Sequence, residues 1–150
     1  MEIDESKKYS VSFRAINDIS IKVYTENNVL TLGSEVDFDI KSNRNDSLNY
    51  FSTSVIGGII SCILTQSKKD KIELEDVEGR IRTTISNPLT LLGVRGYDSV
   101  PQIISCDIVL YYYCEKDISE EFMMKYVEKS LMYNTLKDTI EFNFRFEPQL

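Results

Sequence analysis

The sequence contains three cysteines, whose thiols are the candidate nucleophiles or metal ligands of this chain. Cys62, Cys106 and Cys114 are odd in number and lack the C-x-x-C spacing that is typical of thiolate metal sites. They favour free thiols in a reducing compartment over a disulfide framework, and we expect no metal. A free thiol is a nucleophile where its pKa is lowered, and otherwise a small buried apolar group.

Histidine is absent from the 150 residues. This excludes Ser-His-Asp triads, Cys-His dyads and His-ligated metal centres. Any reaction has to use Cys, carboxylate, Lys, Arg or Tyr side chains, and we expect no cofactor. Gly57 and Gly58 do not indicate a phosphate-binding loop, because no G-x-x-x-x-G-K motif surrounds them.

Cys62 lies in Tyr50–Lys68, the stretch around which the chain is organised. Its centre, Val55–Leu64, is apolar or small at almost every position. The length and the paired glycines favour a helix, although Val and Ile also favour strands. A helix without a polar face is expected to be buried on every side, and ten residues are too few for a membrane span. Ser47 and Asn49 are the candidate N-caps.

Alternating apolar residues predict strands before and after this helix. The ranges before it are Tyr9–Ala15, Ile19–Val23 after a turn at Asn17-Asp18, Val29–Leu32 and Val36–Ile40, a three- or four-stranded antiparallel meander. The ranges after it are Leu74–Ser86, Gln102–Cys114 and Asp138–Phe146. A capping box of Asp117 and Glu120 predicts a second helix, with Phe122, Met123, Tyr126, Val127 and Ser130 on its buried face.

The segment Leu89–Val100 is an unusually apolar loop between two of these strands. Loops that carry so many apolar side chains usually pack against another protein surface or a ligand. The sequence leaves two interpretations open, a contact in a dimer or the wall of an apolar pocket.

Composition and length indicate one α+β domain spanning residues 1–150. The net charge of −7 and the scattered basic residues argue against binding to nucleic acid or to an anionic membrane surface. The polar N-terminus shows no signal peptide, so a cytoplasmic protein is expected. So few other helices cannot enclose an all-apolar helix in one chain, which predicts an obligate symmetric homodimer.

The motif S-x-x-G-G-x-x-S-C ending at Cys62, the run M-Y-N-T-L-K at 132–137 and the order of elements resemble the OsmC/Ohr family of organic hydroperoxide reductases. The resemblance implies an OsmC-like fold, with antiparallel sheets wrapped around a long central buried helix. It also implies an intertwined homodimer in which two such helices cross and the active sites lie at the interface.

The same resemblance implies a peroxiredoxin-like, thiol-dependent chemistry of oxidative stress defence. Cys62 falls on the peroxidatic cysteine, whereas the resolving cysteine is replaced by Ser130 and the glutamate pair by Ser52-Thr53. The thiolate-holding arginine has no direct counterpart, and Arg44 or Lys41 is the candidate for that role.

Two functions are therefore carried forward. The first is a one-cysteine reductase that reduces organic hydroperoxides through Cys62, with reduced activity because the resolving thiol is missing. The second is a non-catalytic dimer that binds a small lipophilic ligand at its interface. A purely structural role for the Cys62 thiol, as a small core residue, fits the second function.

Overall fold

The computed structural model describes residues 6–15, 20–42 and 45–150. The expected turn at Asn17-Asp18, the start of the second strand at Ile19, and the candidate residue Arg44 lie outside these ranges. The chain divides into two compact units, Met1–Tyr50 and Phe51–Leu150, which are described separately.

The first unit contains three short antiparallel strands in sequential order, β1 (Ser12–Ala15), β2 (Ile21–Tyr24) and β3 (Val29–Leu32). They confirm three strands of the predicted meander. The expected fourth strand at Val36–Ile40 is wrong, because this segment forms bends and a turn. Local bonds replace strand pairing there: the N–H of Asp39 donates to the Asp37 carboxylate over 2.8 Å, which is the usual behaviour of Asp in turns.

The first turn of the long helix is capped by Asp46, and the expected caps Ser47 and Asn49 are wrong. The Asp46 carboxylate accepts hydrogen bonds from the N–H of Asn49 at 2.7 Å and from the N–H of Asp37 at 2.6 Å. Asp46 is 5% exposed. One buried carboxylate therefore satisfies a free N–H of the helix start and fixes the loop that leads into it.

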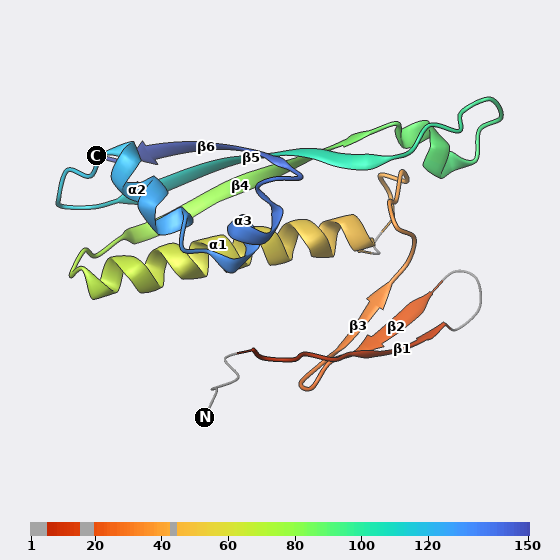
Figure 1. Ribbon diagram of the computed structural model, residues 1–150, viewed down its shortest axis with the longest axis horizontal. Helices are drawn as coiled ribbons and strands as arrows, with labels where there is room; N and C mark the ends of the chain where they lie inside the picture. Colours follow the sequence, from red (N-terminus) through yellow and green to blue (C-terminus); the bar gives the residue numbers. More distant parts are fainter. Residues whose placement is uncertain (1–5, 16–19, 43–44) are drawn as a thin grey trace. The chain divides into compact units, whose positions relative to one another are not determined.

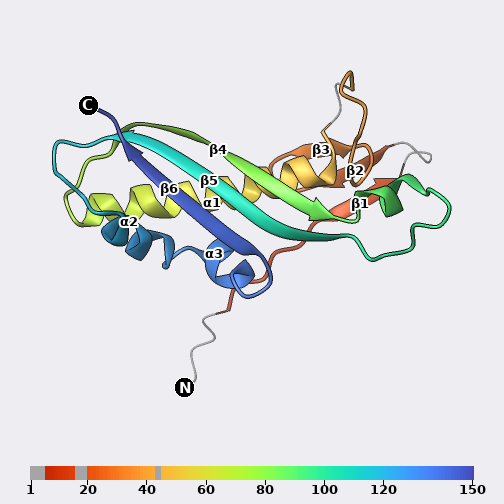
Figure 2. The same ribbon diagram turned by 90° about the horizontal axis from the view of Figure 1, so that it is seen from above.

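The second unit is a three-stranded sheet with helices over one face (Figures 1 and 2). The long helix α1 (Ser47–Lys69) runs into it from the first unit. The remaining elements follow in the order β4 (Glu75–Ser86), the 3₁₀ helix η1 (Pro88–Leu92), β5 (Gln102–Tyr113), α2 (Glu120–Val127), α3 (Leu131–Leu136) and β6 (Glu141–Pro148).

The sheet order is β4-β5-β6, and its pairings are mixed. β4 and β5 are antiparallel, as expected, but β5 and β6 are parallel, with Cys106 opposite Phe142. The expectation of purely antiparallel sheets is corrected at this pair. A parallel pair requires a crossover, and α2 and α3 supply it.

The core lies between α1 and the sheet. α1 contributes a stripe at four-residue spacing, and β5 and α2 supply most of the rest. Cys106, Ile108, Leu110 and Tyr112 alternate along β5 and are buried, whereas Ile104 on the same side of the strand is exposed. The buried apolar residues of this cluster are Val55, Ile59, Ile63, Ile108, Leu110, Tyr112, Met123, Tyr126, Val127 and Phe146.

Within one chain α1 is not buried on every side, contrary to the sequence-based expectation. Its opposite face carries Gly57, Ser61 and Thr65, which are exposed. By length and composition alone α1 is also long enough to cross a membrane, which the ten-residue apolar run by itself had argued against. A single such helix is weak support for a membrane span, because the core helix of a soluble protein has the same length and composition.

The two shorter helices begin at serines. Ser119 caps α2 by accepting from the N–H of Phe122 at 3.2 Å, so the expected capping box that began at Asp117 is wrong. Ser130 caps α3, a helix that the sequence pattern did not predict, by accepting from the N–H of Tyr133 at 3.4 Å.

Candidate functional site

Cys62 lies on the flank of α1 that faces α2. Its thiol is half-buried and donates a hydrogen bond to the backbone carbonyl of Tyr126 over 3.5 Å. Among the described residues this is its one hydrogen bond. The contact ties the Cys62 sulfur to the backbone of the segment that contains Tyr126.

Two further polar contacts continue in the same direction, one from Gln66 of α1 and one from Asp70, the residue directly after this helix. The Lys129 ammonium donates to the Gln66 side-chain oxygen at 3.4 Å, and the Tyr126 hydroxyl donates to the Asp70 carboxylate at 2.8 Å. Cys62, Gln66 and Asp70 are spaced four apart, which aligns them on one side of the helix. These three contacts join α2 and the turn after it to α1 and the residue that follows it.

Tyr126 is 2% exposed, and its position changes how its hydroxyl ionises. Burial raises the pKa of the Tyr126 phenol well above its usual value, and the hydrogen bond to Asp70 and the charge of that carboxylate raise it further. Tyr126 is therefore a neutral donor over the physiological range. Sequence analysis had assigned it to the buried face of the helix but not to a polar contact.

Ser130, which the sequence resemblance placed at the position of a resolving cysteine, lies four residues beyond the Tyr126 carbonyl that Cys62 contacts. It is 1% exposed, and its hydroxyl oxygen already accepts from the N–H of Tyr133. No hydrogen bond joins Ser130 to Cys62 in the described part of the chain. Ser130 therefore follows the segment that contacts Cys62, and its observed role is to cap α3.

The described part of the chain shows no contact between the Cys62 thiol and either of its candidate cationic partners, Arg44 and Lys41. Arg44 lies outside the described ranges, and Lys41 belongs to the first unit, whose placement against the second is not described. Ser52, at the glutamate position of the family pattern, shares a hydrogen bond of 2.7 Å with Thr83 of β4. It therefore ties the start of α1 to the sheet.

The other two cysteines differ sharply in accessibility. Cys106 is 0% exposed, and its sulfur lies 3.9 Å from the Thr83 hydroxyl. Cys106 is therefore part of the core, and its burial raises the pKa of its thiol. Cys114 is half-buried at the end of β5, in a shallow cavity of about 180 Å³ that carries three carboxylates and two ammonium groups.

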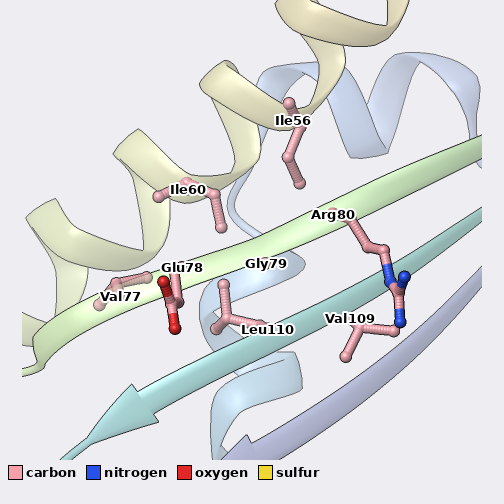
Figure 3. Close-up of a pocket in the computed structure, with 8 residues that line it drawn as sticks. All are labelled: Ile56, Ile60, Val77, Glu78, Gly79, Arg80, Val109 and Leu110. Atoms are coloured by element: carbon pink, nitrogen blue, oxygen red, sulfur yellow. The ribbon is translucent and has the colours of Figure 1, made fainter.

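A second cavity, which we call the apolar notch, lies between α1 and β4 (Figure 3). Its volume is about 160 Å³, and its lining residues are Ile56, Ile60, Val77, Glu78, Gly79, Arg80, Val109 and Leu110. Figure 3 shows Ile56 and Ile60 pointing from α1 toward β4, whereas Arg80 extends away from the helix. Gly79 lies in β4 where a Cβ would meet the Val109 carbonyl of β5, so the close approach of these two strands requires glycine.

The apolar notch and the Cys62 thiol are on different flanks of α1. Ile60 and Cys62 are two positions apart, which places them about 200° apart around the helix axis. Cys62 is not among the residues that line the notch. A molecule bound in the notch of one chain therefore does not reach the thiol of the same chain.

Hydrogen bonds join the two ends of the apolar loop between β4 and β5. The side chains of Asn87 and Thr90 donate to the carbonyls of Val100 and Ser99, at 2.9 and 2.7 Å. Leu89, Leu92, Val94, Tyr97 and Val100 are exposed in the single chain. The loop lines neither of these two cavities, so the choice between dimer contact and pocket wall stays a prediction.

No protein-family model and no curated protein matches this sequence. Solved structures do match its fold. An OsmC-like protein from Mycoplasma pneumoniae has a TM-score of 0.68 at 13% identity, covering 99% of this chain and 100% of its own. An organic hydroperoxide resistance protein OsmC from Legionella pneumophila has a TM-score of 0.65 at 14% identity, covering 95% and 99%.

A putative osmotic stress induced and detoxification response protein from Psychrobacter arcticus has a TM-score of 0.69 at 8% identity, covering 97% of this chain and 100% of its own. The chain therefore has the α+β fold of OsmC-like and Ohr proteins, as the sequence resemblance implied. At these identities the likeness establishes the fold.

Proposed function

We propose that this protein is a thiol-dependent reductase of organic hydroperoxides that works through Cys62 alone and turns over slowly. The observation that carries the proposal is the position of Cys62. It lies half-buried on the long helix of an OsmC-type fold, at the junction with the segment that holds Ser130. Some structures of this fold are named organic hydroperoxide resistance proteins.

The proposed cycle needs an external thiol. The Cys62 thiolate attacks the terminal peroxide oxygen, the O–O bond breaks, and the alkoxide leaves as an alcohol after taking a proton. Cys62 is then a sulfenic acid, which a small thiol converts to a mixed disulfide and water. A second small thiol releases Cys62 and leaves as the disulfide. We expect slow turnover because a serine at position 130 cannot form a disulfide with Cys62, so each cycle waits for two external thiols.

We propose a homodimer as the working form. The exposed face of α1 is formed by small residues, Gly57, Ser61 and Thr65, which would let a second α1 approach closely. A three-stranded sheet normally needs a covering layer, and Phe13 of β1 is 77% exposed within one chain. A second copy would cover both surfaces, and a cytoplasmic location is part of the same proposal.

The test is consumption of cumene hydroperoxide in the presence of a dithiol. The wild type should exceed a Cys62→Ser variant, whereas Cys114→Ser should behave as the wild type and serves as the matched control. Equal rates for the wild type and Cys62→Ser, with both proteins folded by circular dichroism, would remove the reductase proposal.

A second candidate function is favoured by the apolar notch. An OsmC-fold dimer with a structural Cys62 could bind a small lipophilic molecule and catalyse nothing. The hydrogen bond that ties Cys62 to the Tyr126 carbonyl and the isoleucines that line the notch both support this alternative.

A further inference from the structure

Tyr126 of α2 contacts the long helix and its end at two separate places. Its backbone carbonyl accepts from the Cys62 thiol at 3.5 Å, and its hydroxyl donates to the Asp70 carboxylate at 2.8 Å. Cys62 and Asp70 are eight residues apart, which corresponds to about two turns of an α-helix. One residue therefore joins α2 to both ends of this stretch, and we call the set of Cys62, Tyr126 and Asp70 the Tyr126 bridge.

Further contacts restrict the movement of Tyr126. Its carbonyl also accepts from the N–H of Lys129 at 3.1 Å, in the turn that ends α2. Its ring packs edge-on against Phe122, with the ring centroids 5.2 Å apart, and the residue is 2% exposed. The carbonyl that meets the Cys62 sulfur is therefore held in place through both the backbone and the side chain of Tyr126.

Asp70 occupies a position that a helix end alone does not favour. It directly follows α1, where the free carbonyls carry partial negative charge and where the lysines of the last turn are the favourable residues. Burial, and then the hydrogen bond to Asp70, raise the pKa of the Tyr126 phenol, so the hydroxyl donates over the physiological range. A carboxylate placed against the local preference indicates a role in a tertiary contact, and here that contact is with Tyr126.

The Tyr126 bridge limits how easily the Cys62 sulfur is reached from solvent. The thiol is half-buried, and its hydrogen bond holds it against the α2 segment. A reagent gains access when the thiol rotates away from the carbonyl or when the end of α2 moves in a local opening. Movement of α2 also has to break the contact between Tyr126 and Asp70, which therefore opposes the opening.

From these observations we infer that Asp70 and Tyr126 are positioning residues for Cys62, which hold its sulfur against α2 and limit the access of reagents to it. The inference rests on the proposed reductase, in which Cys62 is the reacting thiol, and adds a restraint on that same site. Neither side chain takes part in the chemistry, because Asp70 acts on Tyr126 and Tyr126 acts on the position of the sulfur.

Alkylation of Cys62 by iodoacetamide at pH 8, followed by peptide mass spectrometry, is the measurement. Tyr126→Phe keeps the ring and the carbonyl but loses the hydroxyl, and it should raise the Cys62 rate about fivefold, as the loss of one ordinary hydrogen bond implies. Asp70→Ala should have the same effect, whereas Asp70→Asn retains an accepting oxygen and should stay within about twofold of the wild type. Lys129→Ala removes a different contact to α1 and is the matched control, with an unchanged rate.

Labelling of Cys106 in the same samples separates positioning from general loosening of the fold. Cys106 is 0% exposed and should stay protected in every variant. Equal Cys62 rates in the wild type, Tyr126→Phe and Asp70→Ala overturn the inference. A rise at Cys62 that is matched by a rise at Cys106 also overturns it, since a purely structural role predicts that result. Hydroperoxide consumption is measured separately, and a wild type no faster than Cys62→Ser removes the reductase while the alkylation rates still decide the positioning.

Discussion

The Cys62 thiol donates a hydrogen bond to the backbone carbonyl of Tyr126 over 3.5 Å, so the sulfur on the long helix is tied to the helix that packs beside it. This relationship bears on reactivity, because the bond has to be given up before the sulfur can act as a nucleophile. The predictions below follow from it and from the contacts around it.

Labelling of the cysteines should follow their burial. In the folded protein at pH 8, a maleimide should modify Cys114 first and Cys62 more slowly, because Cys62 is bonded to Tyr126. Cys106 is 0% exposed and burial raises the pKa of its thiol, so it should react only after unfolding. Peptide mass spectrometry over a time course gives the order. Early modification of Cys106 would contradict the described core.

Restoring a second thiol should speed the proposed cycle. Ser130→Cys places a thiol at the end of the segment that contacts Cys62, so oxidation should yield an intramolecular disulfide and faster turnover with a dithiol. The change also removes the cap of α3, which should cost about 1 kcal/mol of unfolding free energy. Ser130→Ala is the matched control, since it loses the cap without gaining the thiol. Equal turnover in the two variants would count against the proposed pairing.

The Tyr126 phenol predicts a loss of stability at alkaline pH. Its pKa is raised in the folded state, so folding favours the protonated form. The contribution is complete below the unfolded value of about 10 and is lost as the pH rises above that value toward the folded pKa. Tyr126→Phe should lower the unfolding free energy at pH 7 by about 1 kcal/mol and flatten the alkaline decline. Urea titrations from pH 7 to 11 measure both effects, and an unchanged alkaline decline would exclude this tyrosine as its cause.

Three glycines should respond differently to alanine. Gly79→Ala has to displace the Val109 carbonyl, so it should destabilise the chain by about 3 kcal/mol or more. Gly58→Ala meets the flexible Met132 side chain at 2.9 Å and should have a small effect. Gly57→Ala meets nothing within 4 Å in its own chain and should stabilise α1 by about 1 kcal/mol in a monomer.

Gly57→Ala therefore also tests the dimer. If a second α1 packs against this face, the added methyl group should weaken association rather than raise stability. Light scattering and sedimentation over a concentration range distinguish the two results. A wild type that stays monomeric at high concentration would refute the proposed homodimer.

Much of the fold could be predicted from periodicity. The alternation around Ile108 identified β5, because burial repeats every two residues along a strand, whereas α1 was predicted from the length and the paired glycines of the apolar stretch around Ile59. The segment after β3 was mistaken for a strand because Val36, Phe38 and Ile40 alternate in the same way. There the side chains of Asp37 and Asp39 bond the backbone locally, and a hydrophobic pattern does not record such bonds.

The site was less predictable for a similar reason. The position of Cys62 on a helix followed from the sequence, but its partner is a backbone carbonyl, which has no signature in residue types. Asp46 was also missed, although an aspartate directly before a helical run is a recognisable cap signal. The notch could not be anticipated, since it lies between two isoleucines of α1 and residues of β4 that are distant in sequence.

The parallel pairing of β5 with β6 has a consequence for how the protein reaches its native state. Ser105 is opposite Glu141, a partner far along the chain, and the intervening residues have to form the crossover first. Such non-local pairs are slow to close because their chain entropy is lost before contacts compensate for it. We expect the hairpin of β4 and β5 to assemble early on α1 and the docking of β6 to limit the refolding rate.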